Sequence, residues 1–269
     1  MIIDTHSHCY WPTLLPRIEE VVSTMKSNNI EKAIQIGCDM ETSKEAIALA
    51  KRFPGIFYAT VGYHPEEAQD IEFDQTIIDE FEALIQKNRE YIVGIGETGF
   101  DFHYIDGTEG GTKKADFENL SKKAKTQIEN QKKWWMAQWK LGQKYDLPLI
   151  IHTRDARDAT LEYMTQNHID RCVMHCFSED LDFAQNLLDF SNEIYFSFSG
   201  ILTYKKSEAI QEVARNISLH RILVETDAPF LSPQAVRGMV NEPANTRYTL
   251  EKLIQLRNES AGEIEKQVY

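Results

Sequence analysis

Residues 32–64 read KAIQIGCDMETSKEAIALAKRFPGIFYATVGYH, and this stretch holds one complete repeat of the pattern that decides the fold. Two short runs rich in β-branched and aromatic residues, 32–37 and 56–64, flank an amphipathic segment over 42–53. A strand, a helix and a second strand in this order place the two strands parallel, because the helix carries the chain back along the sheet. The stretch therefore predicts a parallel sheet covered by helices.

The same alternation continues along the whole chain. Strands are expected at residues 2–6, 32–37, 56–64, 91–97, 147–153, 171–177, 193–200 and 221–227, and helices at residues that include 42–53, 74–88, 207–216 and 246–256. Eight strand and helix units predict an α/β protein with a single (β/α)8 TIM barrel that forms one domain over residues 1–269. An open doubly wound sheet is the alternative, but no Gly-rich dinucleotide-binding turn is evident.

Composition narrows the class of protein. A chain of 269 residues with 42% hydrophobic residues is long enough to bury the core of one large barrel. The net charge of −13 argues against a protein that coats duplex nucleic acid, because such binding needs clustered Lys and Arg. The four cysteines lack the spacing of small disulfide-rich domains and indicate reduced thiols. Met1 leads into the first strand without a basic region or a long apolar segment, so we expect a cytoplasmic protein with neither signal peptide nor membrane span.

Histidines gather at the carboxyl ends of the expected strands, where (β/α)8 enzymes carry their chemistry. His8 lies two residues beyond His6, and this spacing puts both side chains on the same face of a strand. Four histidines lie at or near the ends of different strands, namely His6, His64, His152 and His175. Three others lie in a long loop or just before strands and are expected to be solvated or structural: His103, His168 and His220.

Two carboxylates share this edge, because Glu97 closes the fourth expected strand and Asp227 closes the eighth. Convergence of such side chains from several strands predicts a metal site. The donors are too many for one tetrahedral zinc ion and suit two divalent ions bridged by a carboxylate, with Zn²⁺, Mn²⁺ or Mg²⁺ as candidates. Cys9 and Cys176 each neighbour a histidine and would face away from it in a strand, so we expect them to pack.

Eight motifs lie in order along nearly the whole chain: DTHSH (4–8), GYHP (62–65), GETGFD (96–101), IHTRDA (151–156), HCFS (175–178), SFSGILTYK (197–205), ETDAP (225–229) and RGMVNEP (237–243). Together they resemble the TatD-type metal-dependent deoxyribonucleases of the amidohydrolase superfamily. The resemblance implies a TIM barrel, two divalent metal ions and hydrolysis of DNA phosphodiesters, commonly as a 3′ to 5′ exonuclease that acts at single-stranded ends. No membrane and no obligate protein partner is implied.

The resemblance also implies which residues hold the ions. His6, His8 and Asp227 would hold one ion, and His152 and His175 would hold the other. Glu97 would bridge the two. Attack by a metal-bound hydroxide would follow, with Glu97 and Asp227 as the catalytic carboxylates. Asp227 is the best candidate to accept the proton of the water, and His64 is its competitor.

Other residues are expected around this centre. His64 would line the substrate side, although a histidine that caps the loop before Pro65 is the alternative. Arg154 could face a phosphate, or it could form an ion pair with Asp155 or Asp158. Glu225 shares the inward face of Asp227 and would support the site through hydrogen bonds rather than as a ligand. The resemblance places Asn241 and Glu242 in the loop over the site, where they would order it.

Two other functions stay open. The same architecture can hydrolyse another phosphoester or a C–N or C–O bond, because the attacking hydroxide does not itself choose between phosphorus and a carbonyl carbon. A metal-binding scaffold with weak catalysis is the third reading. The sequence alone does not determine the native metal, the choice between DNA and RNA, the direction of digestion or the oligomeric state.

Three features depart from the family pattern. Cys9 and Tyr10 follow His8 where the family usually carries a Leu-Asp pair, so the support of His8 should differ. Glu179 replaces the usual glycine after HCFS. Residues from about 103 to 125 form a longer insertion after the fourth strand, and the lysines from 113 to 140 outnumber the acidic residues there. These lysines either solvate a helix that packs through its tryptophans, or offer nucleic acid a basic surface with an exposed Trp134.

Overall fold

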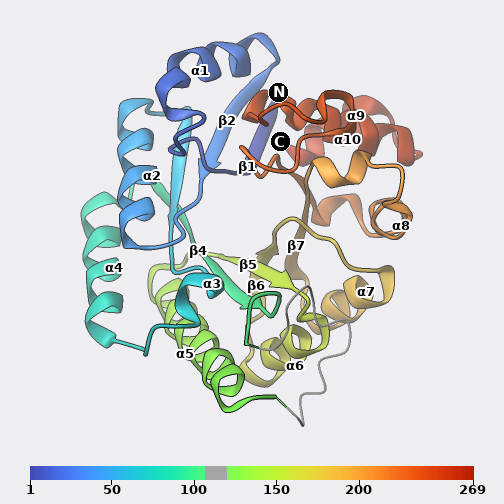
Figure 1. Cartoon of the computed structure of the whole chain (residues 1–269). Coiled ribbons are helices and arrows are strands. Elements are labelled where there is room, and N and C mark those ends of the chain that lie inside the picture. The colour runs from blue at the N-terminus through green and yellow to red at the C-terminus, as the bar shows by residue number, and fades with distance from the viewer. Residues whose placement is uncertain (107–119) are drawn as a thin grey trace.

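The computed structural model describes residues 1–106 and 120–269 and contains one sheet of eight parallel strands (Figure 1). The strands follow the order of the sequence around the sheet: β1 (Ile2–Ser7), β2 (Ile30–Gln35), β3 (Phe57–Val61), β4 (Ile92–Asp101), β5 (Leu149–Arg154), β6 (Arg171–Met174), β7 (Glu193–Phe198) and β8 (Ile222–Val224). Two hydrogen bonds join the end of β1 to the segment after β8. The Asp227 amide donates to the His6 carbonyl over 2.9 Å, and the His8 amide donates to the Ala228 carbonyl over 2.7 Å. The predicted (β/α)8 barrel is confirmed.

Helices lie between successive strands and after the last strand, and they surround the ring of strands (Figure 1). They are α1 (Ile18–Ser27), α2 (Met40–Arg52), α3 (Pro65–Ala68), α4 (Gln75–Asn88), α5 (Lys122–Tyr145), α6 (Arg157–Asn167), α7 (Leu181–Phe190), α8 (Glu208–Asn216), α9 (Thr246–Leu256) and α10 (Ala261–Val268). Five short 3-10 turns complete the described part: η1 (Leu15–Arg17), η2 (Gly200–Thr203), η3 (Leu219–Arg221), η4 (Gln234–Val236) and η5 (Pro243–Asn245). Over residues 1–106 and 120–269, no helix has both the length and the apolar character needed to cross a membrane.

The stretch 32–64 folds as the predicted strand, helix and strand. Helix α2 begins after Asp39, whose carboxylate accepts a hydrogen bond from the Thr42 amide over 2.7 Å while the Thr42 hydroxyl accepts one from the Asp39 amide over 2.9 Å. This reciprocal cap satisfies backbone donors that the first helical turn would otherwise leave free. Ala46, Ile47 and Ala50 form the buried face of the helix. The helix thus returns the chain to the start of β3 in parallel with β2.

Every strand ends one to four residues from its predicted end, and in two strands, β4 and β8, the difference moves a carboxylate of the expected site relative to the strand end. β4 continues beyond Glu97 to Asp101, and it pairs with β5 through Gly99 and His152. At Gly99, φ is 133°, and a Cβ atom would lie 2.2 Å from the His152 carbonyl oxygen, so the close approach of the two strands requires glycine. β8 is shorter than predicted and ends at Val224, so Asp227 lies in the following loop.

The tryptophans of α5 face the barrel and not the solvent. Trp134 and Trp135 are fully buried, and Trp139 is 6% exposed. The Trp134 indole donates a hydrogen bond to the Ile71 carbonyl over 3.2 Å and stacks on Tyr63 with 4.6 Å between ring centroids. The idea that Trp134 is exposed and stacks on a base is therefore wrong, because the indoles anchor the helix to the core.

The lysine-rich segment lies only partly within the described residues. Residues 107–119, which include Lys113 and Lys114, lie outside them, and α5 already begins at Lys122. On the outer face of α5, Lys132 pairs with Glu129 over 2.7 Å, and near its end Lys144 pairs with Glu82. Two lysines of this helix therefore have acidic partners, as on a solvated helix face.

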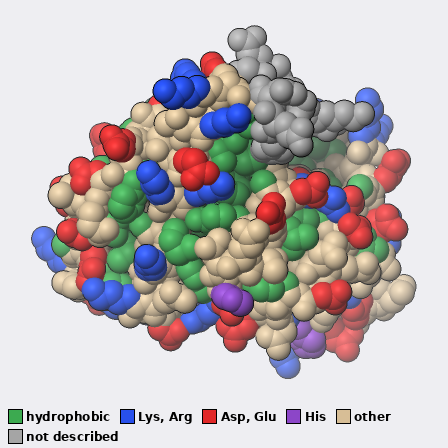
Figure 2. All heavy atoms as spheres, turned by 90° about the horizontal axis from the view of Figure 1, so that it is seen from below, with side chains coloured by type: hydrophobic (Ala, Val, Ile, Leu, Met, Phe, Trp, Pro, Cys, Tyr) green, Lys and Arg blue, Asp and Glu red, His purple; other side chains and the backbone are tan. Residues whose placement is uncertain are grey.

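An outer groove of about 560 Å³ runs along α5 between α4 and α6. Figure 2 views the molecule from this side and shows hydrophobic side chains surrounded by basic and acidic ones. The groove is lined by residues that include Phe73, Met136, Leu141, Lys133 and Lys140. None of the histidines predicted as ligands lines it, so this groove is separate from the strand ends.

Candidate metal centre

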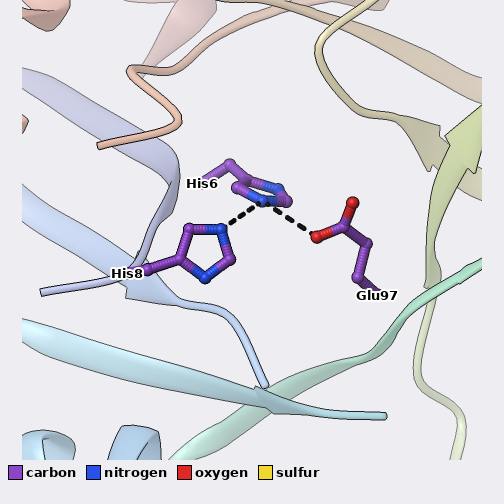
Figure 3. A group of neighbouring side chains, drawn as sticks. All are labelled: His6, His8 and Glu97. Carbon is purple, nitrogen blue, oxygen red and sulfur yellow. Dashed lines mark hydrogen bonds and ion pairs between the residues drawn. The ribbon is translucent and has the colours of Figure 1, made fainter. Parts of the chain in front are cut away.

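Two histidines, a glutamate and an aspartate converge where β1 and β4 meet the loop after β8. Figure 3 shows His6 and His8 pointing toward each other and His6 toward Glu97. The Nε2 atoms of His6 and His8 are 3.2 Å apart, and Nε2 of His6 is 3.4 Å from Oε2 of Glu97. Oδ1 of Asp227 lies 3.4 Å from Nε2 of His8 and 3.6 Å from Nε2 of His6. Four side chains thus direct oxygen and nitrogen atoms at one small space.

A second group of imidazoles lies on the other side of Glu97. Its Oε1 atom is 2.8 Å from Nδ1 of His152 and 2.6 Å from Nε2 of His175. These two ring nitrogens are 3.2 Å apart. Because Oε2 faces His6 and Oε1 faces His152 and His175, the Glu97 carboxylate lies between two sets of donors. The structure thus brings together all six residues predicted as ligands.

The donor set fits divalent cations. Three groups of side chains, His6 with His8 and Glu97, His6 with His175 and Asp227, and His64 with Glu97 and His152, each offer ligand atoms within 4.8 Å of one another. His6 is completely buried, and the Glu97 side chain is 4% exposed. Converging lone pairs are costly to bury without a compensating charge, and imidazole and carboxylate are ligands that Zn²⁺ and Mn²⁺ accept.

Both carboxylates are held in the ionised form. Burial by itself would raise the pKa of Glu97, but the neighbouring imidazoles of His175, His64 and His6 keep that pKa well below its usual value. Burial would likewise raise the pKa of Asp227, and the hydrogen bond from His8 with the other imidazoles lowers it instead. Each carboxylate can therefore bind a cation or accept a proton near neutral pH.

Asp101 is a residue that the sequence analysis missed. Its Oδ2 atom lies 3.0 Å from Nε2 of His152, and its side chain is 2% exposed. A carboxylate that accepts the proton of one ring nitrogen leaves the other nitrogen free to bind a metal. The motif GETGFD contained the signal, because Glu97 and Asp101 are four residues apart and share one face of a strand that continues through both.

Tyr10, which lies two residues after His8, supports the His8 ring. Its hydroxyl donates to the Ile36 carbonyl over 2.7 Å and lies 2.9 Å from Nδ1 of His8. Because the hydroxyl proton is directed at Ile36, its oxygen accepts from Nδ1, and Nε2 of His8 keeps its lone pair for the centre. Burial raises the pKa of Tyr10, so the hydroxyl stays protonated.

His64 caps the loop before Pro65, which is one of the two roles that the sequence left open, and it also lies beside Glu97. Its Nδ1 atom accepts a hydrogen bond from the Glu66 amide over 3.1 Å and caps α3, just before Pro65. This cap leaves the ring proton on Nε2, which lies 3.4 Å from Oε1 of Glu97. His64 therefore presents a hydrogen-bond donor to the centre.

Arg154 lies at the rim of the centre. Its side chain is 44% exposed, its Nη1 atom is 4.0 Å from Oδ2 of Asp101, and its guanidinium lies 5.1 Å from the centroid of the Tyr104 ring. The two expected ion-pair partners have other contacts, since Asp155 pairs with His103 over 2.8 Å and Asp158 with Arg157 over 3.1 Å. Because it is partly exposed, the guanidinium can also meet an anion from solvent.

Glu225 and the loop after β8 hold the centre from behind. Glu225 is completely buried. Its Oε1 atom accepts a hydrogen bond from the Cys176 amide over 2.7 Å and lies 3.5 Å from Nδ1 of His175. Asn241 donates to the Thr226 carbonyl over 3.0 Å. Glu242 pairs with Arg17 over 2.7 Å. The later part of the loop is thus tied both to the segment directly after β8 and to the residue before α1.

The remaining histidines and the cysteines lie outside the proposed ligand set. His168 and His220 are exposed, as expected, and His103 pairs with Asp155. Cys9 contacts the Ser7 hydroxyl and Cys176 that of Ser199. All four cysteines are free, namely Cys9, Cys38, Cys172 and Cys176. Cys38, which the sequence did not single out, lies 3.9 Å from Nδ1 of His8.

A parallel barrel with imidazoles and carboxylates gathered at the carboxyl ends of its strands has the architecture of a metal-dependent hydrolase. Comparison with known families agrees with this class. The chain belongs to the TatD-related DNase family, whose model matches residues 3–269.

Several relatives are similar over nearly the whole chain. An uncharacterized metal-dependent hydrolase of Mycoplasma genitalium is 33% identical over 267 residues, which cover 98% of this chain and 94% of that protein. One of Bacillus subtilis is 31% identical over 267 residues with the same coverage. Among solved structures, a TatD homologue of Escherichia coli superposes with a TM-score of 0.84 at 24% identity, covering 99% of this chain and 94% of that chain. The last similarity supports the fold.

Proposed function

We propose that this protein is a deoxyribonuclease that hydrolyses phosphodiesters at single-stranded 3′ ends with the help of two divalent ions. The observation that carries the proposal is the position of Glu97, whose two oxygens face separate groups of imidazoles. Such a carboxylate is suited to bridge two cations, and two cations close together stabilise both the attacking and the leaving oxygen of a phosphodiester. The family description supports DNA as the substrate.

In this proposal His6, His8 and Asp227 hold one ion, His152 and His175 hold the other, and Glu97 bridges them. Bound Zn²⁺, Mn²⁺ or Mg²⁺ would supply Lewis-acid stabilisation and lower the pKa of water. The residues around the ligands orient them. Asp101 accepts from His152, Tyr10 from His8, and Glu225 lies beside His175.

Asp227 is the residue that we assign as proton acceptor. Its side chain is 15% exposed, so it borders the space that water and substrate can reach, and its pKa is lowered. Its backbone has φ of 59°, and its amide donates to the His6 carbonyl, which fixes the carboxylate at the mouth of the barrel. An ionised carboxylate in this position can take the proton of the attacking water.

His64 and Arg154 are assigned to the phosphate. His64 directs a ring N–H at the space near Glu97, and Arg154 carries an exposed guanidinium at the rim. Both groups donate hydrogen bonds, and a guanidinium can bind two phosphate oxygens at once. We also place the activity in the cytoplasm, and the four free thiols support a reducing compartment.

The test is hydrolysis by protein reconstituted with Zn²⁺, Mn²⁺ or Mg²⁺. Single- and double-stranded DNA and RNA of one sequence, each labelled at the 5′ or the 3′ end, would be compared with carboxylic esters and amides. Stepwise shortening of single-stranded DNA from its 3′ end is expected, with the activity lost in Glu97→Gln. Turnover of esters or amides without cleavage of any phosphodiester would contradict the proposal and favour the C–N or C–O alternative.

A further inference from the structure

Exposed hydrophobic side chains gather beside the metal centre. Two loops, one after β1 and one after β8, supply five of the large hydrophobic side chains that are exposed in the described part of the chain: Trp11, Leu15, Phe230, Met239 and Val240. Leaving such groups in water carries a free-energy cost, and an exposed apolar patch in a folded protein commonly marks a binding site.

Two of these side chains, Trp11 and Phe230, form an aromatic pair that lies between the proposed ligand His8 and solvent. Trp11 is 41% exposed and Phe230 is 43% exposed. Their ring centroids are 5.2 Å apart with an interplanar angle of 82°. The Phe230 ring in turn lies 6.2 Å from the imidazole of His8. The pair therefore borders the centre directly.

The backbone of both aromatic residues is held in place. The Trp11 amide donates to the His8 carbonyl over 3.1 Å, and the Phe230 amide donates to the Asp227 carbonyl over 2.9 Å. The Asn241 side chain donates to the Phe230 carbonyl over 2.7 Å. Each aromatic ring is thus three residues from a proposed metal ligand and tied to it by a hydrogen bond, so the pair is preorganised.

We propose that Trp11 and Phe230 form a subsite that stacks on an unpaired nucleobase next to the phosphate at the metal centre. The inference rests on the proposed function and names the part of the substrate that these rings recognise. Every nucleobase has a flat π face, and stacking on aromatic side chains is tolerant of sequence. In a duplex both faces of an interior base are covered by its neighbours, so the subsite selects single-stranded ends.

The loop after β8, which carries Phe230, also carries positive charge. Arg237 is exposed, and its guanidinium lies 4.7 Å from the centroid of the Tyr204 ring, which belongs to the loop after β7. The Tyr204 hydroxyl donates to the Ser232 carbonyl over 3.0 Å and joins the two loops. Arg237 can bind the phosphate backbone of a DNA strand whose base stacks on the aromatic pair. Aromatic and basic groups together are typical of sites for single-stranded nucleic acid.

Tryptophan fluorescence tests the subsite without catalysis. Trp11 is exposed, whereas Trp134, Trp135 and Trp139 are buried, so quenching by a bound base reports on Trp11. The protein would be titrated with a short oligothymidylate and, separately, with an abasic oligomer of the same length. Each titration would be done on the wild type in the presence of chelator, which prevents hydrolysis, and on the Asp227→Asn variant in the presence of metal. Strong quenching by oligothymidylate and little by the abasic oligomer is expected.

Affinity of labelled oligomers in the variants provides the second readout. Trp11→Ala and Phe230→Ala should each weaken binding of oligothymidylate by about tenfold, as loss of one stacked base predicts, with little change for the abasic oligomer. Tyr195→Ala, which removes an exposed aromatic ring near the start of β7, is the matched control and should bind like wild type. Thermal melting shows that each variant is folded.

The outcomes separate this inference from the proposed function. Equal quenching and affinity for the two oligomers, or unchanged affinity in both folded variants, would overturn the subsite even if the protein degrades DNA. Base-dependent quenching that is lost with the aromatic pair would support the subsite even if no phosphodiester is cleaved, and only the proposed hydrolysis would then fall.

Discussion

Oδ2 of Asp101 lies 3.0 Å from Nε2 of His152, on the side of the ring that faces away from Glu97. Burial lowers the pKa of His152, but the hydrogen bonds to Asp101 and Glu97 outweigh it and raise that pKa to about 9. A bound ion would take the place of the proton on Nδ1, and the contact with Asp101 would then keep the other proton on Nε2, so that Nδ1 could bind the ion. The orientation of a proposed ligand thus depends on a carboxylate behind it.

Asp101→Asn should weaken metal binding at the site that includes His152. An amide can present its NH₂ group to Nε2 and favour the wrong tautomer, and loss of such an outer partner typically costs 10- to 100-fold in affinity. Chelator competition with Zn²⁺ measures the effect. Asp158→Asn, which changes an exposed aspartate paired with Arg157, is the control. Equal affinity in both variants would show that Asp101 does not orient His152.

Tyr10→Phe should weaken the site that includes His8 by roughly tenfold, because Nδ1 of His8 loses its acceptor. The absorption spectrum of bound Co²⁺ should change as well, since the ligand ring is no longer fixed. Tyr163→Phe also removes a hydroxyl that donates to a backbone carbonyl, that of Lys132, and serves as control. An unaltered spectrum and affinity in Tyr10→Phe would mean that packing alone orients His8.

Asp227→Asn should retain the fold and much of the metal while losing proton acceptance. The expected cost is on the order of 10²-fold or more in the rate of hydrolysis, as for a positioned general base. Single-turnover rates on labelled single-stranded DNA, with the metal content of each sample determined, provide the measurement. Near wild-type turnover would transfer the role to His64.

Metal analysis should find about two divalent ions per chain after reconstitution, and fewer in Glu97→Ala. Removal of the ions should also lower the melting temperature, because a ligand that binds only the folded state at 100 times its Kd adds about 2.7 kcal/mol to the free energy of unfolding. Scanning calorimetry with and without chelator tests this effect. Trace occupancy, with no change in Glu97→Ala, would contradict a binuclear centre.

The stability of the fold should depend on pH through Glu259. Hydrogen bonds from the Arg257 guanidinium lower the pKa of Glu259 to about 2 from 4.5, and the same guanidinium donates to the Ala214 and Ile217 carbonyls at the end of α8. A lowered carboxyl pKa adds stability above pH 4.5 that is lost as the pH falls toward 2.

Glu259→Gln should therefore lower the free energy of unfolding at pH 7 by less than about 1 kcal/mol, because the carboxylate is partly exposed. The difference from wild type should shrink at pH 3.5. Urea denaturation at the two pH values measures it. A difference that does not depend on pH would assign the effect to packing.

The sequence by itself determined the barrel and the position of the proposed ligands within it. Alternating strands and helices leave few ways to cover a parallel sheet, and eight units close it. Because the strands are parallel, residues at their carboxyl ends meet at one edge whatever the details of packing. His6, His152 and His175 could therefore be grouped from their places along the chain alone.

Other contacts of the site were decided only by the tertiary structure. The end of β4 depends on its pairing with β5 at Gly99, so the four-residue spacing of Glu97 and Asp101 could be interpreted only once the strand was known to continue to Asp101. Trp134 is buried because its face of α5 meets the barrel, which composition does not reveal. Trp11 and Phe230 are 219 positions apart in the chain, and they meet because closure of the sheet brings the loop after β1 against the loop after β8. Such contacts arise from long-range packing, which the periodicity of a single segment does not encode.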